Sequence, residues 1–385
     1  MADADIRPEV LHVNTGKTWR GGEQQTLYLL RGLAERGLRA EAAFQAGSPA
    51  AQRAREVGVR VHELPMRTEA DLPAAIEIAR LVRRLGINIL HSHTAHAHTL
   101  ASLAKNVLSA GCRLVVHRRN EYRPGRGPLG LGKLKYRHGV DAYIAISNRN
   151  KQILVDYGIK PWRIFPVRSV TDPQRFINAA PNPGLRRELG IPEDAYVAGN
   201  IGYLVTQKDH VNLLEAARIA LAEIPDLWII IVGSGPLRDR VLRKAEELGL
   251  SGRVVLTGFR DDIPQLIRMF DLFALSSVAE GLCSVLLEVS ACECPIVATD
   301  AAGVREAVPD GEAAIIVPTR DPAALAEGMV RLATEPETAR RLAAAARKRV
   351  ARYFTVDALA EQTLAVYRRV LAGEVGPRYP VAPAP

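Results

Sequence analysis

Two glutamates, Glu280 and Glu288, stand at the ends of the short apolar segment EGLCSVLLE. An unpaired carboxylate is costly inside an apolar core, so both ends of the segment must reach solvent or meet a polar partner. The surrounding pattern predicts a strand, a loop that carries Glu280, and a helix with Ser284 as N-cap and Glu288 about one turn inside it. The alternative is a pair of solvated glutamates, of which Glu280 is favoured by the helix dipole.

A carboxylate beside free helix amides matches a ligand that carries both hydroxyl and phosphate groups. A nucleotide sugar has both, and a second carboxylate suits the vicinal hydroxyls of a ribose. Neighbouring strand ends carry further candidates. Gly233 and Gly235 end the apolar strand LWIIIVG and would let backbone approach a ligand, and Phe259 lies in TGFRDDI, which ends the next strand in the same way.

The first strand-to-helix loop, NTGKTWRGG, ends in the pair Gly21 and Gly22 and contains Lys17 and Arg20. It lacks the glycine spacing of a P-loop and of a dinucleotide-binding fold. Bare amides at a helix start favour an anion, so we expect Gly21, Gly22 and Arg20 to contact a phosphate or an acceptor. A tight turn that needs small residues is the alternative.

Histidines gather in HSHTAHAH, residues 91–98, after a predicted strand. No nearby carboxylate or cysteine completes a metal-binding set, so we expect no metal here. His93 and His96 are instead candidates to line a polar cleft, and structural or surface histidines are the alternative. His117 and Arg119 leave the next strand for a glycine-rich basic segment, residues 120–139, which suits an anionic acceptor or lipid surface, or is a solvated mobile loop.

The framework around these loops alternates strand-like and helix-like segments almost without a break, which predicts parallel sheets built from βαβ units. A proline-rich interval over 160–194 interrupts the alternation. We therefore predict two doubly wound α/β domains that face each other across a cleft. The first covers 1–168 and is rejoined by a helix over 356–373, the second covers 169–355, and 374–385 form a disordered tail.

Composition narrows the functional classes. The 385 residues carry a net charge of +9, which leans towards an anionic partner, but no aromatic-interleaved basic patch points to nucleic acid. We find no apolar run long enough for a membrane span and no signal-like start, so a cytoplasmic protein is expected. The four cysteines are few and irregularly spaced, which favours reduced thiols over a zinc site.

The stretch over 280–308, EGLCSVLLEVSACECPIVATDAAGVREAV, resembles the donor-binding signature of the retaining glycosyltransferases of family 4, also called group 1, which have the GT-B fold. NIGYLVTQKDHVNLLEA resembles their phosphate-binding turn, and HVNTGKTWRGGEQQ resembles their glycine-pair loop. The resemblance covers roughly 10–372.

The resemblance implies a role for each matching residue. Glu280 would contact the hydroxyls of the donor sugar, Glu288 the nucleotide ribose, and Lys208 the diphosphate, with the glycine pair approaching the phosphate from the other domain. Catalytic roles would fall to Glu280, Lys208, Arg119 and His117. The remaining expected donor contacts are Gly202, Gly233, Gly235, Phe259, Gly281, Leu282, Cys283 and Ser284.

Three positions depart from the family pattern. Tyr203 stands where an arginine is usual, which removes one of two expected diphosphate cations. Arg119 is the nearest match to a histidine that the family often places near the sugar, with His117 two residues earlier. Cys283 replaces a more usual residue after EG, which bears on the choice of sugar.

We therefore expect a retaining, metal-independent hexosyltransferase that uses a UDP- or GDP-sugar and needs no cofactor. A glycan or lipid-linked acceptor in polysaccharide or lipopolysaccharide synthesis would suit the basic first domain, with peripheral contact to the inner face of an anionic membrane. A nucleotide-sugar epimerase of the same architecture and a non-catalytic binding subunit remain alternatives. The sequence leaves the oligomeric state open.

Overall fold

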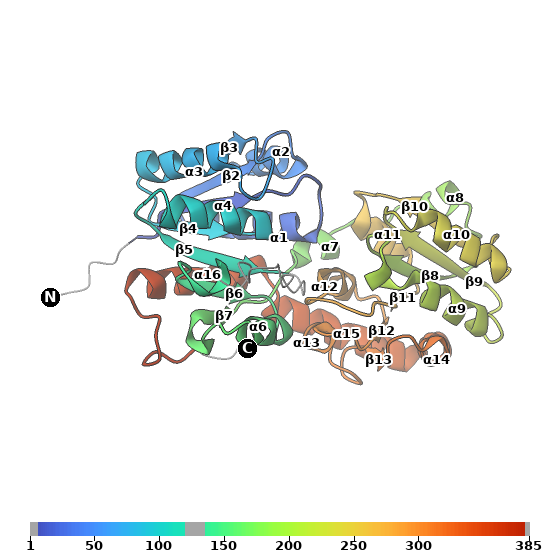
Figure 1. Ribbon diagram of the computed structural model, residues 1–385. Helices are drawn as coiled ribbons and strands as arrows, with labels where there is room; N and C mark the ends of the chain where they lie inside the picture. Colours follow the sequence, from blue (N-terminus) through green and yellow to red (C-terminus); the bar gives the residue numbers. More distant parts are fainter. Residues whose placement is uncertain (1–6, 120–134, 382–385) are drawn as a thin grey trace. The chain divides into compact units, whose positions relative to one another are not determined.

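The computed structural model describes residues 7–119 and 135–381. The chain divides into two compact units (Figure 1). Unit 1 runs to Val170 and resumes at Val356, and unit 2 is Thr171–Thr355. The sequence placed the first boundary after residue 168, inside the proline-rich interval.

Unit 1 is built on a parallel sheet in which the described strands follow the order β3-β2-β1-β4-β5-β6-β7. The register places His12 of β1 opposite His91 of β4, and His91 opposite Val115 of β5. The strands are β1 Val10–Asn14, β2 Ala40–Gln45, β3 Arg60–Leu64, β4 Ile89–Ser92, β5 Arg113–Arg118, β6 Ala142–Ala145 and β7 Ile164–Pro166.

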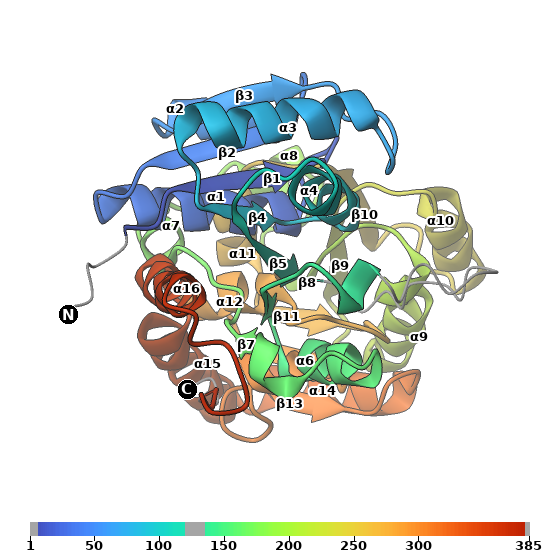
Figure 2. The same ribbon diagram turned by 60° about the vertical axis from the view of Figure 1, so that its left-hand side comes forward.

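Helices cover both faces of this sheet because its strands are apolar on both sides. Leu11 and Leu114 face a core shared with α3 and α4, whereas Val10 and Val115 face a core shared with α1 and α16 (Figure 2). The helices are α1 Gly21–Glu35, α2 Pro49–Glu56, α3 Leu72–Leu85, α4 Ala95–Asn106, α6 Asn148–Asp156 and α16 Val356–Leu371, with a 3-10 turn at η1 Pro161–Arg163.

Helix α16 belongs to unit 1 although it follows unit 2 in the chain. It packs against α1, where Gly32 leaves room for it, since a Cβ at Gly32 would lie 2.9 Å from the Cβ of Ala360.

The tail expected to be disordered has defined contacts over 374–381. The Arg369 guanidinium donates to carbonyl oxygens of Tyr379 and Pro380, and two valines of this segment pack on the core, which its proline-rich composition did not predict.

Unit 2 contains a second parallel sheet with the order β10-β9-β8-β11-β12-β13. Its strands are β8 Tyr196–Ile201, β9 Leu227–Val232, β10 Val254–Gly258, β11 Leu272–Leu275, β12 Ile296–Thr299 and β13 Ile315–Val317. Its helical segments are α7 Pro173–Ile177, α8 Leu185–Glu188, η2 Thr206–Lys208, α9 His210–Ala220, α10 Arg238–Glu247, α11 Ile263–Met269, α12 Ser284–Ala291, α13 Val304–Ala307, α14 Pro322–Thr334 and α15 Pro336–Tyr353.

Both sheets have the strand order of a doubly wound fold, with a point where the order reverses. That point lies between β1 and β4 in unit 1 and between β8 and β11 in unit 2. Ligands of such sheets bind outside the carboxyl ends of the strands at these points. Among the residues that the structure describes, no helix has both the length and the apolar composition needed to cross a bilayer.

Candidate functional site

The reversal point of unit 2 brings together two oppositely charged side chains. Lys208 ends η2, after β8, and Glu280 lies in the loop after β11. The Lys208 Nζ atom lies 2.6 Å from Glu280 Oε1, and Ser277 donates its hydroxyl to the same oxygen at 2.6 Å. Both charged side chains keep some access to solvent, with exposed fractions of 19% for Lys208 and 11% for Glu280. The pair is therefore ordered yet reachable by a ligand.

Hydrogen bonds to the backbone tie the two loops to each other. Ser276 donates its hydroxyl to the carbonyl oxygen of Lys208 at 2.8 Å, and the Val278 amide donates to the carbonyl of Gln207 at 2.8 Å. From the next strand, Thr299 donates its hydroxyl to the carbonyl of Ser277 at 2.6 Å. These residues position Lys208 and Glu280. The sequence analysis did not single them out, although the serine pair directly after the strand LFAL was a visible polar signal.

The charges of the pair stabilise each other. Burial alone would lower the pKa of Lys208, but the adjacent Glu280 carboxylate outweighs burial and holds that pKa above its ordinary value. Lys208 is therefore cationic throughout the physiological range. An ammonium has three donors, so a bond to Glu280 leaves donors for a second anionic group such as a phosphate.

The start of α12 differs from the prediction. Ser284 is the first helical residue, and the N-cap is Cys283 in the left-handed region at φ 57°, with no side-chain hydrogen bond to the helix. The predicted N-cap at Ser284 is wrong because the chain turns sharply one residue earlier. The Cys283 side chain does not cap the helix, and the Leu286 amide donates to the carbonyl oxygen of Cys283 at 3.0 Å, which leaves the preceding amides at the start of α12 as candidate donors to an anion. Leu282 and Cys283 are buried, and Gly281 and Ser284 are half-buried.

Glu288 lies one turn into α12 and is half-buried. Burial raises its pKa from 4.5 to about 7, and the positive charge of Arg175 offsets only part of this shift. A carboxylate that has lost water without gaining strong donors is ready to accept hydrogen bonds from ligand hydroxyls. The geometry is compatible with the ribose contact that the resemblance implies for this residue.

Three glycines near the Lys208–Glu280 pair allow the backbone of neighbouring turns to pack closely against them. A Cβ at Gly233 would lie 2.0 Å from the carbonyl oxygen of Gly202, and one at Gly235 would lie 2.6 Å from the Leu204 amide nitrogen. The turn after β8 fills the space beside the Cα atoms of these two glycines, and their approach to a ligand stays a prediction. Gly303, which received no role from the sequence, leaves room in the same way for the carbonyl oxygen of Gly281, at 2.2 Å from its Cβ position.

Gly202 has a second neighbour, because a Cβ there would lie 3.1 Å from Cε of Lys208. The glycine therefore lets the lysine side chain cross the end of β8.

Tyr203 and Phe259 are both exposed, with exposed fractions of 39% and 56%. Phe259 follows β10, at the edge of the sheet, which leaves its ring accessible.

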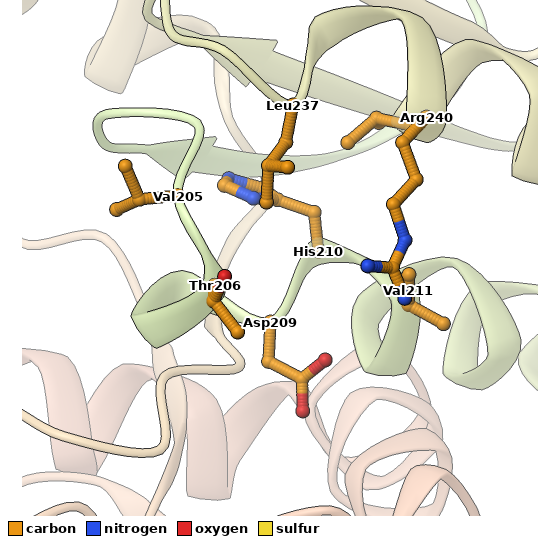
Figure 3. Close-up of a pocket in the computed structure, with 8 residues that line it drawn as sticks. Val205, Thr206, Asp209, His210, Val211, Leu237 and Arg240 are labelled. Carbon is orange, nitrogen blue, oxygen red and sulfur yellow. The ribbon is translucent and has the colours of Figure 1, made fainter.

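A small cavity of about 40 Å³ lies beside the turn that carries Lys208 (Figure 3). It is far too small for a nucleotide. Figure 3 shows the His210 ring between Val205 and Leu237, with Arg240 on the other side. Burial, aided by the charge of Lys208, lowers the pKa of His210 to about 4, so this imidazole is neutral and adds no charge to the site.

In unit 1 the predicted glycine pair opens α1, and Arg20 is the exposed N-cap. The buried carboxylate of Glu23 accepts from the Arg20 amide at 3.1 Å and fills the space beside Gly16. Thr15 and Thr94, which follow β1 and β4, share a hydrogen bond of 2.7 Å between their hydroxyls. The glycine loop is thus held at the reversal point of the unit 1 sheet.

A cluster of buried imidazoles lies under this loop. His93 Nε2 is 2.9 Å from His12 Nδ1, and His91 Nδ1 is 2.6 Å from the Tyr367 hydroxyl of α16. His117 stacks on His91, with ring centroids 5.4 Å apart. Burial lowers the pKa of all four histidines far below the usual value, to about 3 for His12. The cluster is therefore uncharged at neutral pH.

Arg119 fixes the tautomers of part of this cluster. Its guanidinium can only donate, and it lies 3.0 Å from His93 Nδ1 and 3.4 Å from His117 Nδ1. His93 must therefore carry its proton on Nε2 and donate it to His12 Nδ1. The proton of His12 is then on Nε2, which has no hydrogen-bond partner among the described residues.

His12, His91 and His93 form the one group in the described part of the chain whose ligand atoms are close enough for a metal ion. The network nevertheless occupies both ring nitrogens of His93. A metal would also stand near the Arg119 cation. In the structure these imidazoles form a hydrogen-bonded cluster, and the absence of a metal stays a prediction.

Two other predicted features lie elsewhere. His96, on the first turn of α4, bonds to the carbonyl oxygen of Thr68 and does not join the cluster. Most of the basic segment, 120–134, lies outside the described residues. Its last part includes Lys135, which donates to the carbonyl of Ala95 at 2.7 Å and to the hydroxyl of Thr99 at 2.6 Å.

Two family models match the chain. Residues 19–175 match Glycosyltransferase Family 4, and residues 182–349 match Glycosyl transferases group 1. The D-inositol 3-phosphate glycosyltransferase of Corynebacterium urealyticum is 31% identical over 326 residues, which cover 80% of this chain and 73% of that protein.

Two further proteins match over almost their whole length. The lipopolysaccharide core biosynthesis glycosyltransferase LpsE of Rhizobium meliloti is 25% identical, over 92% of this chain and 98% of that protein. The crystal structure of Anabaena Alr3699/HepE in complex with UDP and glucose superposes with a TM-score of 0.82 at 20% identity, over 93% of this chain and 98% of that one. The chain belongs to the group 1 glycosyltransferases and has their GT-B fold of two Rossmann-like domains.

Proposed function

We propose that this protein is a retaining, metal-independent hexosyltransferase that uses a UDP- or GDP-sugar. The observation that carries the proposal is the Lys208–Glu280 pair at the reversal point of unit 2, beside the uncapped start of α12. A cation and free amides suit a diphosphate, and a carboxylate suits sugar hydroxyls. The HepE structure, which has the same fold, contains UDP and glucose.

In the proposed reaction, Lys208 and the amides of α12 stabilise the diphosphate as it leaves, in the place of a cation. Glu280 already accepts two hydrogen bonds through one oxygen, which suits it to hold hydroxyls of an oxocarbenium-like sugar better than to attack it. The acceptor hydroxyl enters on the face that the diphosphate leaves and passes its proton to the departing phosphate. This route retains the configuration at the anomeric carbon.

We propose further that the acceptor is a glycan or lipid-linked molecule of polysaccharide or lipopolysaccharide synthesis. LpsE, which matches nearly the whole chain, is named for lipopolysaccharide core synthesis. The net charge of +9 favours binding to an anionic surface, such as the inner face of the cytoplasmic membrane. Binding to anionic and to neutral vesicles would test that placement.

A donor screen tests the proposal directly. Ligand binding stabilises a folded protein, so the thermal shift with UDP-, GDP- and ADP-sugars should identify one donor. That donor is then supplied with candidate acceptors, with and without EDTA, and the anomeric configuration of the product is read by NMR. Inversion, or loss of activity with EDTA, contradicts the proposed mechanism.

The same assay separates the two alternatives. Conversion of the donor sugar without an acceptor would indicate an epimerase. Donor binding without turnover on any acceptor would indicate a binding subunit. Neither alternative is favoured by a specific feature of the site beyond the exposed Tyr203, which stands where a second diphosphate cation was expected.

A further inference from the structure

Arg118, the last residue of β5, is a buried cation. Among the described residues no other arginine or lysine is as deeply buried, and the exposed fraction of Arg118 is 5%. It lies on the face of the sheet that α4 covers, because Val116, two residues earlier in the strand, belongs to the core shared with α3 and α4. A buried charge is costly unless an opposite charge and hydrogen bonds replace the lost water.

Elsewhere in unit 1 a buried charge is matched. The carboxylate of Glu41, whose side chain is fully buried, accepts hydrogen bonds from Arg39 at 2.7 Å, Arg60 at 3.3 Å and His62 at 2.6 Å. The Arg118 guanidinium makes one hydrogen bond within the described part of the chain, from Nη1 to the hydroxyl of Tyr136 at 3.1 Å. A phenol is a neutral acceptor, so the positive charge of Arg118 is not balanced in this way.

The nitrogens of Arg118 that remain form one edge of the guanidinium. Nε and Nη2 are both buried and have no hydrogen-bond partner among the described residues. Their N–H groups point the same way along this edge, which is the side-on fork that binds the two oxygens of a carboxylate in parallel hydrogen bonds. Tyr136 therefore holds the guanidinium by the nitrogen that such an anion does not use.

His98 supplies a second unpartnered polar group close by. It lies in the first turn of α4 with an exposed fraction of 1%, and neither of its ring nitrogens has a partner among the described residues. Its ring meets the Tyr136 ring edge-on, with the centroids 4.9 Å apart. Burial lowers the pKa of His98 well below the usual value, and the charges of Lys135 and Arg118 add to the shift. The imidazole is therefore neutral, and one of its nitrogens is a donor.

We propose that Arg118 anchors a carboxylate-binding site at the carboxyl end of β5. Ligands of doubly wound sheets bind beyond these strand ends. A carboxylate suits the site because its single negative charge balances one guanidinium and its two oxygens match the fork, with His98 as a further donor nearby. The two nitrogens are buried, so a ligand reaches them with a local movement of the surrounding side chains. The carboxylate belongs to an acidic acceptor, such as a glycan that ends in a uronic acid. Only this last assignment rests on the function proposed above.

A pair of sugars tests the site on the full chain, without a donor and without turnover. Methyl α-D-glucuronoside and methyl α-D-glucoside differ only in the carboxylate. Calorimetric titration should show the glucuronoside binding about 10-fold more tightly or better, as for a charge-assisted hydrogen-bonded pair, and Arg118→Gln should abolish the difference. Arg113→Gln is the matched control, because Arg113 is an exposed cation at the opposite end of β5 and pairs with Asp141. Equal affinities for the two sugars in the wild type, or an unchanged difference in Arg118→Gln, would overturn the proposal.

Two further comparisons identify the anion and the fork. If methyl α-D-glucoside 6-phosphate gains more from Arg118 than the glucuronoside does, the site binds phosphate and the assignment to a carboxylate is wrong. Arg118→Lys keeps the charge without the planar fork and should lose most of the preference for the glucuronoside. If Arg118→Gln does not fold, the lysine variant decides in its place, and full preference in that variant would contradict the proposal.

Stability separates a binding role from a structural one. Without ligand, Arg118→Met should unfold at a higher urea concentration than the wild type, because the substitution removes a buried charge that no described group matches. A structural arginine requires the opposite, so a lower midpoint would count against the site. Transfer assays with acidic and neutral acceptors test only the assignment to the acceptor. Failure of transfer to every acceptor would contradict the proposed function, whereas transfer to neutral acceptors alone would remove only the acidic acceptor.

Discussion

Lys208 and Glu280 lie 72 residues apart in sequence, and their charged atoms are 2.6 Å apart in the folded unit. The contact exists because β8 and β11 are neighbours at the point where the strand order reverses. Removal of an ion pair from most of its water costs desolvation energy, and a pair of this kind adds little to the stability of a fold. This cost is consistent with the binding role proposed for the pair.

Replacement of Lys208 by alanine should weaken binding of the nucleoside diphosphate about 10- to 100-fold, as expected for loss of a charged hydrogen bond. The uncharged nucleoside should bind as before, because it makes no phosphate contact. Calorimetric titration with UDP or GDP and with the matching nucleoside measures both. Lys244, which pairs with Glu215 on the surface of unit 2, provides a control substitution. Unchanged diphosphate affinity would remove Lys208 from the site.

Replacement of Glu280 by glutamine should nearly abolish transfer and leave free diphosphate affinity unchanged or somewhat higher. The amide keeps the shape but loses the negative charge that competes for Lys208 and holds the sugar hydroxyls. Initial rates and diphosphate titrations on the same preparation separate these effects. A parallel loss of turnover and of diphosphate binding would show that Glu280 has another role.

Donor affinity should increase with pH through neutrality because of Glu288. Its carboxyl has a pKa of about 7, and only its charged form presents two unprotonated oxygens, both strong acceptors, to a pair of hydroxyls. Affinity for an intact nucleotide sugar should therefore rise several-fold from pH 6 to pH 8. Glu288→Gln should bind weakly and show a flat profile. A profile that stays equally steep in Glu288→Gln would assign the titration to another group.

The same carboxyl predicts an opposite trend for stability. The native pKa lies above the unfolded value of 4.5, so the native state holds the proton more tightly, and stability falls as pH rises from about 4.5 to about 7. Glu288→Gln removes this fall and should stabilise unit 2 by about 2–3 kcal/mol at pH 8, with little effect at pH 4. Urea unfolding at both pH values measures the difference, and equal effects at the two would contradict it.

Substitution of Gly303 by alanine should disturb the loop of Glu280. Its φ is 88°, and the added Cβ would collide with the carbonyl oxygen of Gly281. Gly311 is the matched control, because its φ is 68° but its Cβ position has no neighbour within 4 Å. Both alanine variants should lose about 1 kcal/mol to backbone strain, whereas only Gly303→Ala should also lose donor affinity. Similar donor affinities in the two variants would exclude this supporting role.

The sequence predicted much of this arrangement because periodicity and loop chemistry are local properties. Alternating strands and helices indicated two parallel sheets, and Glu280 stood out as a carboxylate at a strand exit. Its partner Lys208 could not be identified in this way. The contact between the two residues depends on the order of the strands in the sheet, which no local sequence pattern contains. The resemblance alone led to Lys208.

Other details depend on contacts between distant segments and were missed for that reason. Gly233 and Gly235 leave room for the backbone of Gly202 and Leu204, and this packing role could not be read from the sequence around them. Ser284 resembles an N-cap until the left-handed backbone of Cys283 is known. His93 and His12 are 81 residues apart, so their hydrogen bond could not be read from the spacing within HSHTAHAH.

The return of α16 to unit 1 has a consequence for how the protein is made. Unit 2 is a continuous segment, whereas unit 1 lacks α16, and with it Tyr367, until the ribosome has synthesised all of unit 2. Until then the face of the N-terminal sheet that α16 shares with α1 is covered by α1 without α16. The core between α1, α16 and the sheet of unit 1 can therefore be completed only after the whole of unit 2 has been synthesised.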